Sequence, residues 1–416
     1  MSWSRIALAL IGLHVVDDNF IQPEPGVAAT DHLISGLVPL ALVVATAACY
    51  PRLRPGARAA LALLFGVLGI VAGTEAAYYA ANGGASGDDF TGFLSVAAGL
   101  LLLFISGKTL WTSRRVAGRP ARRYGRRLLL TVGAAAVAMF VVFPISLAYV
   151  VTHTARAEVP LAHLGPAHED VEFETSDGLR LKGWYIRSRN RAAVIVFPGR
   201  SGPQKQARML ARHGYGVLLF DRRGEGASEG DPNIFGWGGE RDLHAAAIYL
   251  RSRPDVDASR IGGIGLSVGG EMLIHAAAHS DAFKAIVTEG ASGQSVRDEL
   301  ANPGLSDRLL DIPTQLSLTA ALTVFTNQLP PPSLKSEVAK IAPTPVFFVY
   351  GEHGQGGTEA RPNHAFYAAA GKPKQIWEVP NGQHIAGITT RPAEYEHRIV
   401  AFFDRALLGA TSREKE

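Results

Sequence analysis

A serine between glycines is the strongest candidate for chemistry in this sequence. Ser267 is the central residue of Gly-Leu-Ser-Val-Gly at 265–269, after an apolar run at 261–266 and before a helical pattern at 268–279. A serine on a tight strand-to-helix turn projects its hydroxyl above the strand ends, and flanking glycines let strand and helix pass closely. The start of the helix adds a backbone donor and a favourable dipole for developing negative charge. The pattern and its position therefore predict a nucleophilic serine.

A histidine near the C-terminus can supply the base that such a serine needs. A hydroxyl is a weak nucleophile at neutral pH until a neighbouring base accepts its proton. His384 comes shortly after an apolar run at 375–379, and so after the last expected strand. We therefore expect His384 to lie within hydrogen-bonding distance of Ser267.

The region around these two residues alternates short apolar runs with helical patterns. Ser-Asp-Gly at 176–178 separates the first two runs and predicts a hairpin turn. Apolar strands that alternate with helices indicate a parallel sheet covered on both faces. We therefore expect an α/β fold with a mostly parallel, eight-stranded sheet. The expected strands lie near 171–175, 179–186, 192–197, 217–220, 261–266, 285–288, 346–350 and 375–379, and the expected helices near 203–213, 238–252, 268–279, 359–370 and 391–408.

Four motifs, in the expected chain order, resemble those of the α/β-hydrolase family over about residues 165–410. They are Phe-Pro-Gly-Arg-Ser-Gly at 197–202, Asp-Arg-Arg-Gly-Glu-Gly-Ala-Ser at 221–228, the turn around Ser267, and Val-Pro-Asn-Gly-Gln-His at 379–384. The resemblance implies an α/β-hydrolase fold with Ser267 as nucleophile, His384 as base, and the backbone N–H groups of Val268 and Arg200 as the oxyanion hole. It includes the serine aminopeptidase and dienelactone-hydrolase branches, which leaves ester and peptide bonds both open.

The acid of the expected triad departs from the family's pattern. The resemblance implies a carboxylate three residues after the glycine that ends the seventh strand, Gly351, and that position holds Gly354. Glu352 lies at the strand end, whereas Glu359 lies beyond a glycine-rich loop at the start of the next helix. The sequence slightly favours Glu352, keeps Glu359 as the alternative and leaves a missing acid open.

Residues 292–340 interrupt the alternation between the sixth and seventh strands, where the resembled family commonly inserts a cap. The segment is rich in leucine and ends in three consecutive prolines at 330–332. An apolar cap over Ser267 would favour acyl or other hydrophobic substrates. The alternative, equally weighted, is that these residues pack on the sheet.

Two histidines have the spacing of metal ligands on a helix. His275 and His279 are separated by four residues, but no third ligand with a typical spacing is apparent. We therefore expect an ordinary helix surface there, and a protein without a metal or another cofactor.

The N-terminal third differs in composition from the rest of the chain. Of 416 residues, 47% are hydrophobic and 19% are charged, whereas about a quarter are charged in typical soluble domains. Apolar segments at 33–50, 57–80, 90–111 and 128–151 are each close to the ~20 residues that a helix needs to cross a bilayer. A shorter segment at 6–16 is a fifth candidate. Four to five transmembrane helices are therefore expected within residues 1–151.

The loops between these segments alternate in charge. Loops 17–32 and 81–89 contain acidic residues and no Lys or Arg, whereas loops 51–58 and 108–127 are rich in arginine. Short basic loops stay in the cytoplasm, so the last span would carry the C-terminal part of the chain to the outer side. The same basic loops explain the net charge of +4, and we expect no nucleic-acid partner.

Together these features predict an integral, multi-pass protein of the cytoplasmic (plasma) membrane. Residues 1–151 would form the transmembrane region, 152–168 a linker, and 169–410 an extracytoplasmic hydrolase domain with a short cap at 292–340. We expect a membrane-anchored serine hydrolase that cleaves an ester, thioester or amide through an acyl-enzyme. Its partners would be a small-molecule or lipid-like acyl substrate and the lipid bilayer. The alternative is a non-catalytic membrane protein that uses a hydrolase-like fold as a binding module.

Overall fold

The computed structural model divides the chain into two compact units. We call them the helical unit (Met1–Ala155, Asp231–Asn233 and Glu299–Pro330) and the sheet unit (the remainder). The structure describes residues 2–82, 89–113, 120–156, 158–293, 295–297, 304 and 307–409. Parts of the expected acidic loop 81–89 and basic loop 108–127, including Asp88, Arg114, Arg115 and Arg119, lie outside these residues.

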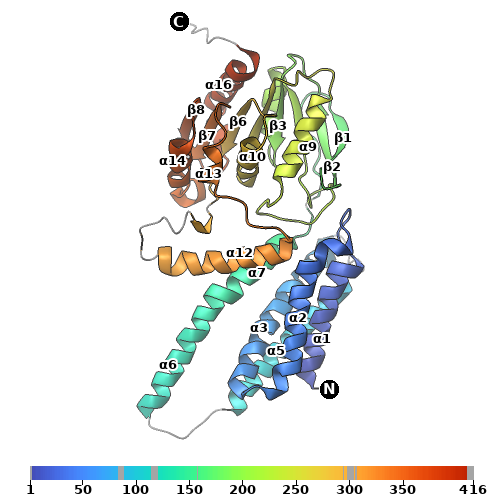
Figure 1. Cartoon of the computed structure of the whole chain (residues 1–416), viewed down its shortest axis with the longest axis vertical. Helices are drawn as coiled ribbons and strands as arrows, with labels where there is room; N and C mark the ends of the chain where they lie inside the picture. The colour runs from blue at the N-terminus through green and yellow to red at the C-terminus, as the bar shows by residue number, and fades with distance from the viewer. Residues whose placement is uncertain are drawn as a thin grey trace. The chain divides into compact units, whose positions relative to one another are not determined.

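The sheet unit is built on an eight-stranded sheet, which confirms the expected fold class (Figure 1). Its order is β1-β2-β4-β3-β5-β6-β7-β8. The β1–β2 and β2–β4 pairs are antiparallel, and the remaining pairs are parallel. The strands are β1 (Glu169–Glu174), β2 (Arg180–Ile186), β3 (Ala193–Phe197), β4 (Gly216–Phe220), β5 (Ile261–Leu266), β6 (Ala285–Glu289), β7 (Val346–Gly351) and β8 (Lys374–Val379).

Helices cover both faces of this sheet because its central strands are apolar on both sides. In β3, Ile195 faces the cluster that includes α9 (Glu240–Arg251), α10 (Val268–Ala278) and α14 (Ala360–Ala369). Its neighbour Val194 faces the cluster that includes α8 (Gln204–Arg212) and α16 (Pro392–Phe403). This two-sided burial produces the continuous apolar runs seen in the sequence.

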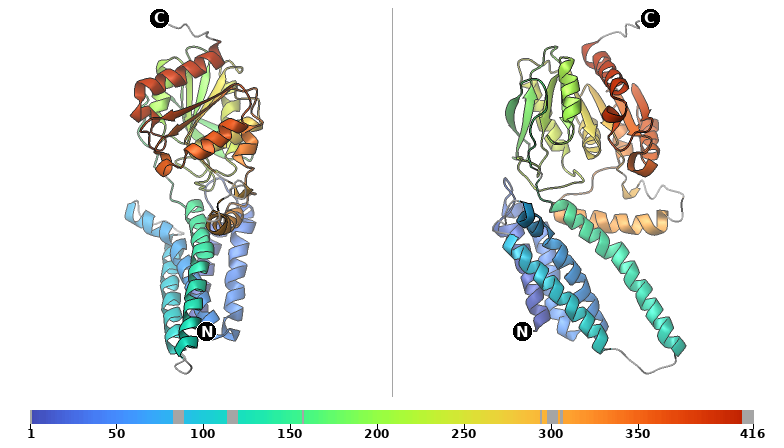
Figure 2. Two further views of the ribbon diagram at one scale, coloured as in Figure 1. Left: turned by 90° about the vertical axis from the view of Figure 1, so that its left-hand side faces the viewer. Right: turned by 180° about the vertical axis from the view of Figure 1, so that it is seen from behind.

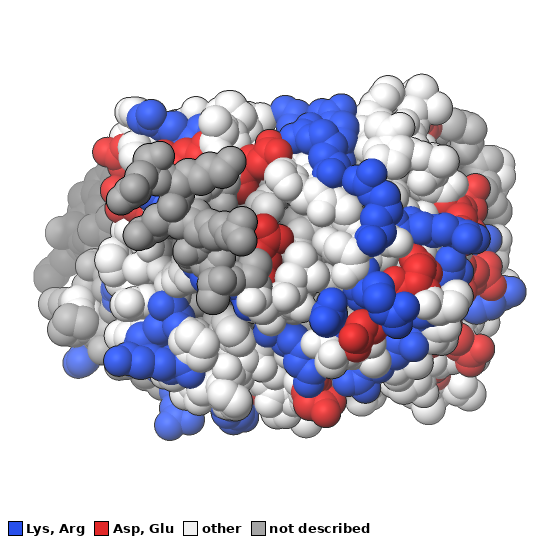
Figure 3. Space-filling model, turned by 90° about the horizontal axis from the view of Figure 1, so that it is seen from above, with Lys and Arg blue, Asp and Glu red and all other residues white. Residues whose placement is uncertain are grey.

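Both acidic and basic side chains lie on the surface shown in Figure 3, where basic side chains gather in a band across the middle of the view. Several surface pairs of the sheet unit are ionic, among them Arg180–Glu229, Arg212–Glu396 and Arg398–Glu394. Such exposed pairs contribute little to stability, typically about 0–1 kcal/mol each.

The helical unit contains long apolar helices that run alongside one another (Figures 1 and 2). Among the described residues, five helices are long and apolar enough to cross a membrane: Ala29–Arg52, Pro55–Ala81, Phe90–Thr112, Gly125–Thr152 and Arg308–Thr326. The first four correspond to the four long segments expected from the sequence. Arg308–Thr326 was not expected to be one of them.

These segments contain the helices α2 (Leu33–Cys49), α3 (Pro55–Ala72), α4 (Thr74–Asn82), α5 (Asp89–Thr112), α6 (Pro120–Val137) and α7 (Phe143–Thr152). Short π-helical or 3-10 segments adjoin them: η1 (Asp17–Ile21), η2 (Ala29–His32), η3 (Tyr50–Arg52) and η4 (Ala138–Val142). The short apolar segment expected at 6–16 is α1 (Trp3–Val16), and its residues Ala7, Leu8 and Ile11 pack in the core of the bundle.

Helices α3 and α5 approach each other closely through glycine. A Cβ at Gly99 would lie 2.6 Å from the carbonyl oxygen of Gly66. Along the same antiparallel seam, Ser95 Oγ donates a hydrogen bond to Gly69 O at 2.9 Å, and Ser106 Oγ donates to the carbonyl of Ala59 at 2.8 Å. Small residues and interhelical hydroxyl bonds are the usual means of holding helices together in lipid.

The segment expected as a cap divides between the two units. Its helix α12 (Ile312–Thr326) groups with the helical unit and packs on α7 and α2, after the short π-helix η5 (Asp307–Asp311). The shorter α13 (Leu334–Val338) packs against α10 and α14 in the sheet unit. Glu299–Pro330 therefore groups with the helical unit, whereas the chain from Pro331 onward groups with the sheet unit.

Candidate active site

The turn after β5 presents Ser267 at the carboxyl edge of the sheet. Ser267 adopts φ 52° and ψ −125°, a region that side-chain-bearing residues rarely occupy. The flanking glycines permit this geometry: a Cβ at Gly265 would overlap the carbonyl of Gly269, and a Cβ at Gly269 would lie 2.5 Å from Cδ of Pro198. Ser267 as a whole residue is half-buried.

Ser267, His384 and Glu359 form a continuous hydrogen-bonded chain. Ser267 Oγ lies 2.9 Å from Nε2 of His384, and Nδ1 of the same imidazole contacts Oε1 of Glu359. Glu359 is fully buried, and its second oxygen accepts the backbone N–H of Gly351 at 3.1 Å. This arrangement can pass a proton from the serine to the imidazole, while the carboxylate holds the ring and stabilises its charge.

The structure places Glu352, the slightly favoured acid, away from the imidazole. Its carboxylate accepts the backbone N–H of Asn381 at 2.8 Å. Successive side chains along a strand point in opposite directions. The position of Glu352 next to Gly351 in the sequence therefore does not bring its carboxylate to His384. Glu359 fills that position from the residue just before α14.

Of the two expected oxyanion donors, Val268 has a suitable N–H. Val268 is the first residue of α10, so its N–H has no acceptor within the helix. The N–H of Arg200, by contrast, donates to Oδ1 of Asp221 at 2.8 Å. The Arg200 guanidinium pairs with the other oxygen of Asp221 and lies over the Trp184 ring. This buried ion pair occupies the Arg200 N–H and leaves it unavailable as an oxyanion donor in this arrangement.

Glu289 is a buried acid beneath the site that sequence reasoning missed. Its backbone oxygen accepts the N–H of Ser267 at 2.7 Å. Its carboxylate accepts the N–H of Gly387 at 2.8 Å and the hydroxyl of Tyr395 at 2.7 Å. Burial raises the pKa of Glu289. Glu289 therefore ties the serine turn to the segment that follows His384. The available signal was an acidic residue ending an otherwise apolar strand.

Glu271 performs a similar bracing role in the first turn of α10. Its carboxylate accepts the backbone N–H groups of Gly293 at 2.7 Å and Ser292 at 3.2 Å. Burial raises the pKa of Glu271, against the lowering effect of these two bonds. The connection that leaves β6 is thereby fastened to the helix that begins at the serine.

The two histidines with metal-ligand spacing have separate surroundings. His279 pairs with the buried carboxylate of Glu337 at 2.6 Å. Burial lowers the pKa of His275, which keeps its imidazole neutral more readily. Among the described residues, no group of three His, Cys, Asp or Glu side chains is arranged to hold a metal ion.

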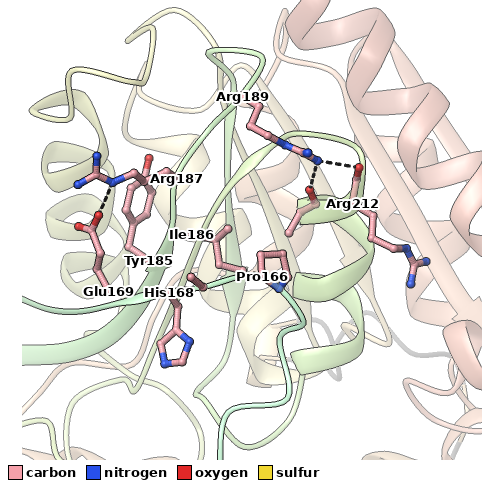
Figure 4. A pocket seen from close by; sticks show the side chains of 10 residues that line it. Pro166, His168, Glu169, Tyr185, Ile186, Arg187, Arg189 and Arg212 are labelled. Carbon is pink, nitrogen blue, oxygen red and sulfur yellow. Dashed lines mark hydrogen bonds and ion pairs between the residues drawn. The ribbon is translucent and has the colours of Figure 1, made fainter.

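A pocket of about 760 Å³ lies elsewhere in the sheet unit (Figure 4). Its arginines are already engaged: Arg187 pairs with Glu169, Arg189 donates to the carbonyls of Ala211 and Arg212, and Arg212 pairs with Glu396. None of the residues that line the pocket belongs to the Ser267–His384–Glu359 chain.

A family model matches the middle part of the chain. The model of the X-Pro dipeptidyl-peptidase (S15) family matches residues 151–353. This stretch contains Ser267 and ends before Glu359 and His384.

Individual proteins also match part of the chain. The chain is 28% identical over 261 residues to the uncharacterized protein YfhR of Escherichia coli O157:H7, which covers 58% of this chain and 81% of YfhR. It is 29% identical over 203 residues to the thiohydrolase aneE of Aspergillus aculeatus, covering 47% of this chain and 63% of that protein. The Pyrococcus furiosus esterase Pf2001 superposes with a TM-score of 0.50 at 21% identity, over 62% of this chain and 98% of the esterase.

The sheet unit therefore has the α/β-hydrolase fold, as its strand order and its structural neighbours show. The matching family and the relatives support a hydrolase.

Proposed function

We propose that the chain is a membrane-anchored serine hydrolase that cleaves an ester, or a thioester or amide, on the extracytoplasmic side of the cytoplasmic membrane. The observation that carries the proposal is the hydrogen-bonded chain from Ser267 through His384 to Glu359. A buried carboxylate, an imidazole and a half-exposed serine on a strained turn are the components of a nucleophilic triad.

In the first half of the reaction, Ser267 Oγ attacks the substrate carbonyl and its proton passes to Nε2 of His384. The oxyanion of the tetrahedral intermediate accepts a hydrogen bond from the N–H of Val268. The C–O, C–S or C–N bond then breaks, and His384 returns the proton to the leaving group. An acyl-enzyme on Ser267 remains.

In the second half, water attacks the acyl carbonyl while His384 accepts one of its protons. Collapse of the second intermediate returns the proton to Ser267 and releases the carboxylic acid. The carboxylate of Glu359 stabilises the imidazolium in both halves.

The comparisons favour acyl substrates without selecting one. One relative is a thiohydrolase and one structural neighbour is an esterase, whereas the matching family model is that of a dipeptidyl-peptidase. We favour esters and thioesters, because no residue of the described site is identified as a receptor for a peptide amino terminus.

A fluorophosphonate probe tests the nucleophile directly. The full-length wild type should become labelled, and Ser267→Ala should not. Ser259→Ala, which removes an exposed hydroxyl that bonds Asp257, is the matched control and should label like the wild type. Equal labelling of Ser267→Ala would refute the triad by placing the reactive nucleophile elsewhere. No labelling of folded wild type would refute the triad and leave the binding-module alternative.

The orientation rests on the arginine-rich loops 51–58 and 108–127. A cysteine at Leu161, which is 80% exposed in the linker, should react with an impermeant maleimide on intact cells once Cys49 is replaced by serine. A cysteine at Gly56, where a Cβ has nothing within 4 Å, should react only after permeabilisation. The reverse pattern would place the sheet unit in the cytoplasm.

A further inference from the structure

The segment Arg308–Thr326 exposes large apolar side chains, and its helix α12 contains no charged residue. The sequence of α12 is Ile-Pro-Thr-Gln-Leu-Ser-Leu-Thr-Ala-Ala-Leu-Thr-Val-Phe-Thr. Leu316 is 52% exposed, and in the preceding turn Leu309 and Leu310 are 61% and 44% exposed. Leu309 and Leu310 lie between Arg308 and Asp311. A cluster of exposed leucines is nevertheless costly in water, so a partner that covers these side chains is expected.

The opposite face of α12 packs on helices of the transmembrane bundle. Leu318, Ala321 and Leu322 are buried there, and the main neighbour is α7, within the candidate span Gly125–Thr152. The helix that α12 contacts also has exposed apolar side chains on itself or on the turn before it, among them Val141, Phe143 and Val150. The exposed leucines therefore adjoin a larger apolar surface. A partner that covers the exposed apolar side chains of α7 would therefore also cover the exposed leucines at α12.

The C-terminal end of α12 is held at one end of the bundle. The ring of Phe325 meets Tyr149 edge-on at 5.6 Å and His153 at 5.8 Å, where α7 ends. Nδ2 of Asn327 donates to the carbonyl of Asp31, just before α2 begins. Both partners lie where spans emerge toward the acidic loop 17–32 and the linker, which is the level of a membrane–water boundary.

The direction of α12 differs from that of the spans. In the left view of Figure 2, α12 is seen nearly along its axis, whereas the spans of the helical unit run lengthwise. Figure 1 shows α12 crossing α7. Within the helical unit, α12 therefore lies across the bundle.

The chain connections also oppose a membrane crossing by this segment. Arg308–Thr326 has 19 residues and is long enough to span. However, the chain leaves the sheet unit at Asp298 and rejoins it at Pro331. A single crossing would leave these two points on opposite sides of the membrane, and a return through lipid without a second helix would expose unpaired backbone groups.

We propose that Arg308–Thr326 is an interfacial helix, embedded in the leaflet on the side of the sheet unit, with Leu309, Leu310 and Leu316 among the lipid acyl chains. The proposal rests on the membrane anchoring proposed above and not on hydrolase activity. It gives the sheet unit a second membrane attachment besides the linker, inserted between β6 and β7.

Depth-dependent fluorescence quenching tests the proposal on the full-length Cys49→Ser protein in phosphatidylcholine vesicles. A nitrobenzoxadiazole label on Leu316→Cys should be quenched more strongly by lipid that carries a doxyl group at C5 than at C12. A label on Met139→Cys, in the middle of the last span, should show the opposite order. A label on Leu161→Cys, in the linker, should be quenched by neither. Leu310→Cys is a second position if Leu316→Cys does not fold.

Each outcome for position 316 is decisive. The shallow pattern supports the interfacial helix, the pattern of position 139 identifies a span, and the pattern of position 161 shows a helix covered by protein or water. The last two overturn the proposal.

Sidedness provides an independent measurement. Cysteines at Gly304 and Gln328 should both react with an impermeant maleimide from the same side of the membrane. Reaction from opposite sides would overturn the interfacial helix. Reaction of both from the cytoplasmic side would keep it and refute only the orientation proposed for the sheet unit.

Discussion

The carboxylate of Glu359 occupies the space that a side chain on Gly354 would need. A Cβ built on Gly354 would overlap Cδ and both oxygens of Glu359. Residue 354 is the position at which the resembled family carries its acid. The absence of a side chain at Gly354 leaves room for the Glu359 carboxylate. Glu359, at the start of the next helix, therefore places its carboxylate where an acid at position 354 would lie.

Moving the carboxylate from position 359 to position 354 should preserve part of the activity. Glu359→Ala is expected to lower kcat/KM for an ester by about 10³- to 10⁴-fold, because the imidazole loses its orienting charge. Gly354→Ala should also lower it, by displacing the carboxylate. Adding Gly354→Asp to Glu359→Ala should recover part of the loss, since a carboxylate carbon one bond beyond the new Cβ falls near the former position of Glu359 Cδ.

Glu352→Gln is the matched control for this exchange and should remain within about twofold of wild type, because Glu352 bonds only the Asn381 N–H among the contacts described for its side chain. Steady-state ester hydrolysis measures all four variants. A Glu352→Gln variant as impaired as Glu359→Ala, or a fully active Gly354→Ala, would contradict the assignment of the acid.

The ion pair between Arg200 and Asp221 should make a large contribution to folding. Both side chains are 6% exposed, so Asp221→Ala leaves a buried guanidinium without its carboxylate. We expect the free energy of unfolding to fall by about 3–5 kcal/mol. Glu394→Ala breaks the exposed Arg398–Glu394 pair and should cost about 0.3–0.5 kcal/mol. Denaturant unfolding of both variants in detergent gives the comparison, and equal costs would show that burial does not govern the Arg200 pair.

Two glycines of α5 should respond differently to alanine. Gly99→Ala places a methyl group 2.6 Å from the Gly66 carbonyl and should destabilise the α3–α5 contact by about 1–3 kcal/mol. Gly107→Ala has nothing within 4 Å and should be neutral or slightly stabilising. Thermal unfolding in detergent distinguishes the two variants. A Gly99→Ala protein as stable as Gly107→Ala would disprove the close packing of α3 on α5.

Asp177 in the β1–β2 turn should make stability depend on pH. Burial by itself raises the pKa of Asp177, but hydrogen bonds and charge from Arg223, with help from Arg241, outweigh it and hold the pKa well below its usual value of 3.8. Because the unfolded chain binds this proton first, the stabilisation is complete above about pH 4 and is lost as the pH falls further.

Asp177→Asn should therefore lower the free energy of unfolding by about 1–3 kcal/mol at pH 7, and the difference from wild type should shrink below about pH 4. Asp281→Asn, at an 88% exposed carboxylate, is the control and should change little at either pH. Melting temperatures over pH 3–7 provide the test. A difference that grew as the pH fell would mean that the sign assigned to this carboxylate is wrong.

The fold could be predicted from the sequence because its signals are local. The central strands β3 to β7 are largely apolar runs of five or six residues bounded by turn residues, so their positions follow from the sequence pattern. Ser267 was identifiable for the same reason, since the glycines that permit its backbone geometry lie within two residues of it.

The choice of acid, the oxyanion donors and the fate of the insertion depend on contacts between distant residues. Glu352 and Glu359 are both glutamates close to Gly354 in the sequence. Only the packing of the loop at Gly354 directs Glu359, and not Glu352, to His384. The Arg200 N–H donates to the carboxylate of Asp221, which directly follows β4, the next strand in the chain. The leucines of 309–322 are equally suited to a sheet surface, a cap or lipid, and only the structure shows that α12 packs on α7.

Periodic hydrophobicity and the composition of one tight turn thus determined the secondary structure, the apolar helices and the position of Ser267 on its turn, because these depend on neighbours along the chain. Tertiary structure decided which carboxylate meets the imidazole and which surface α12 covers, because a side chain's partner is set by the geometry that brings remote segments together.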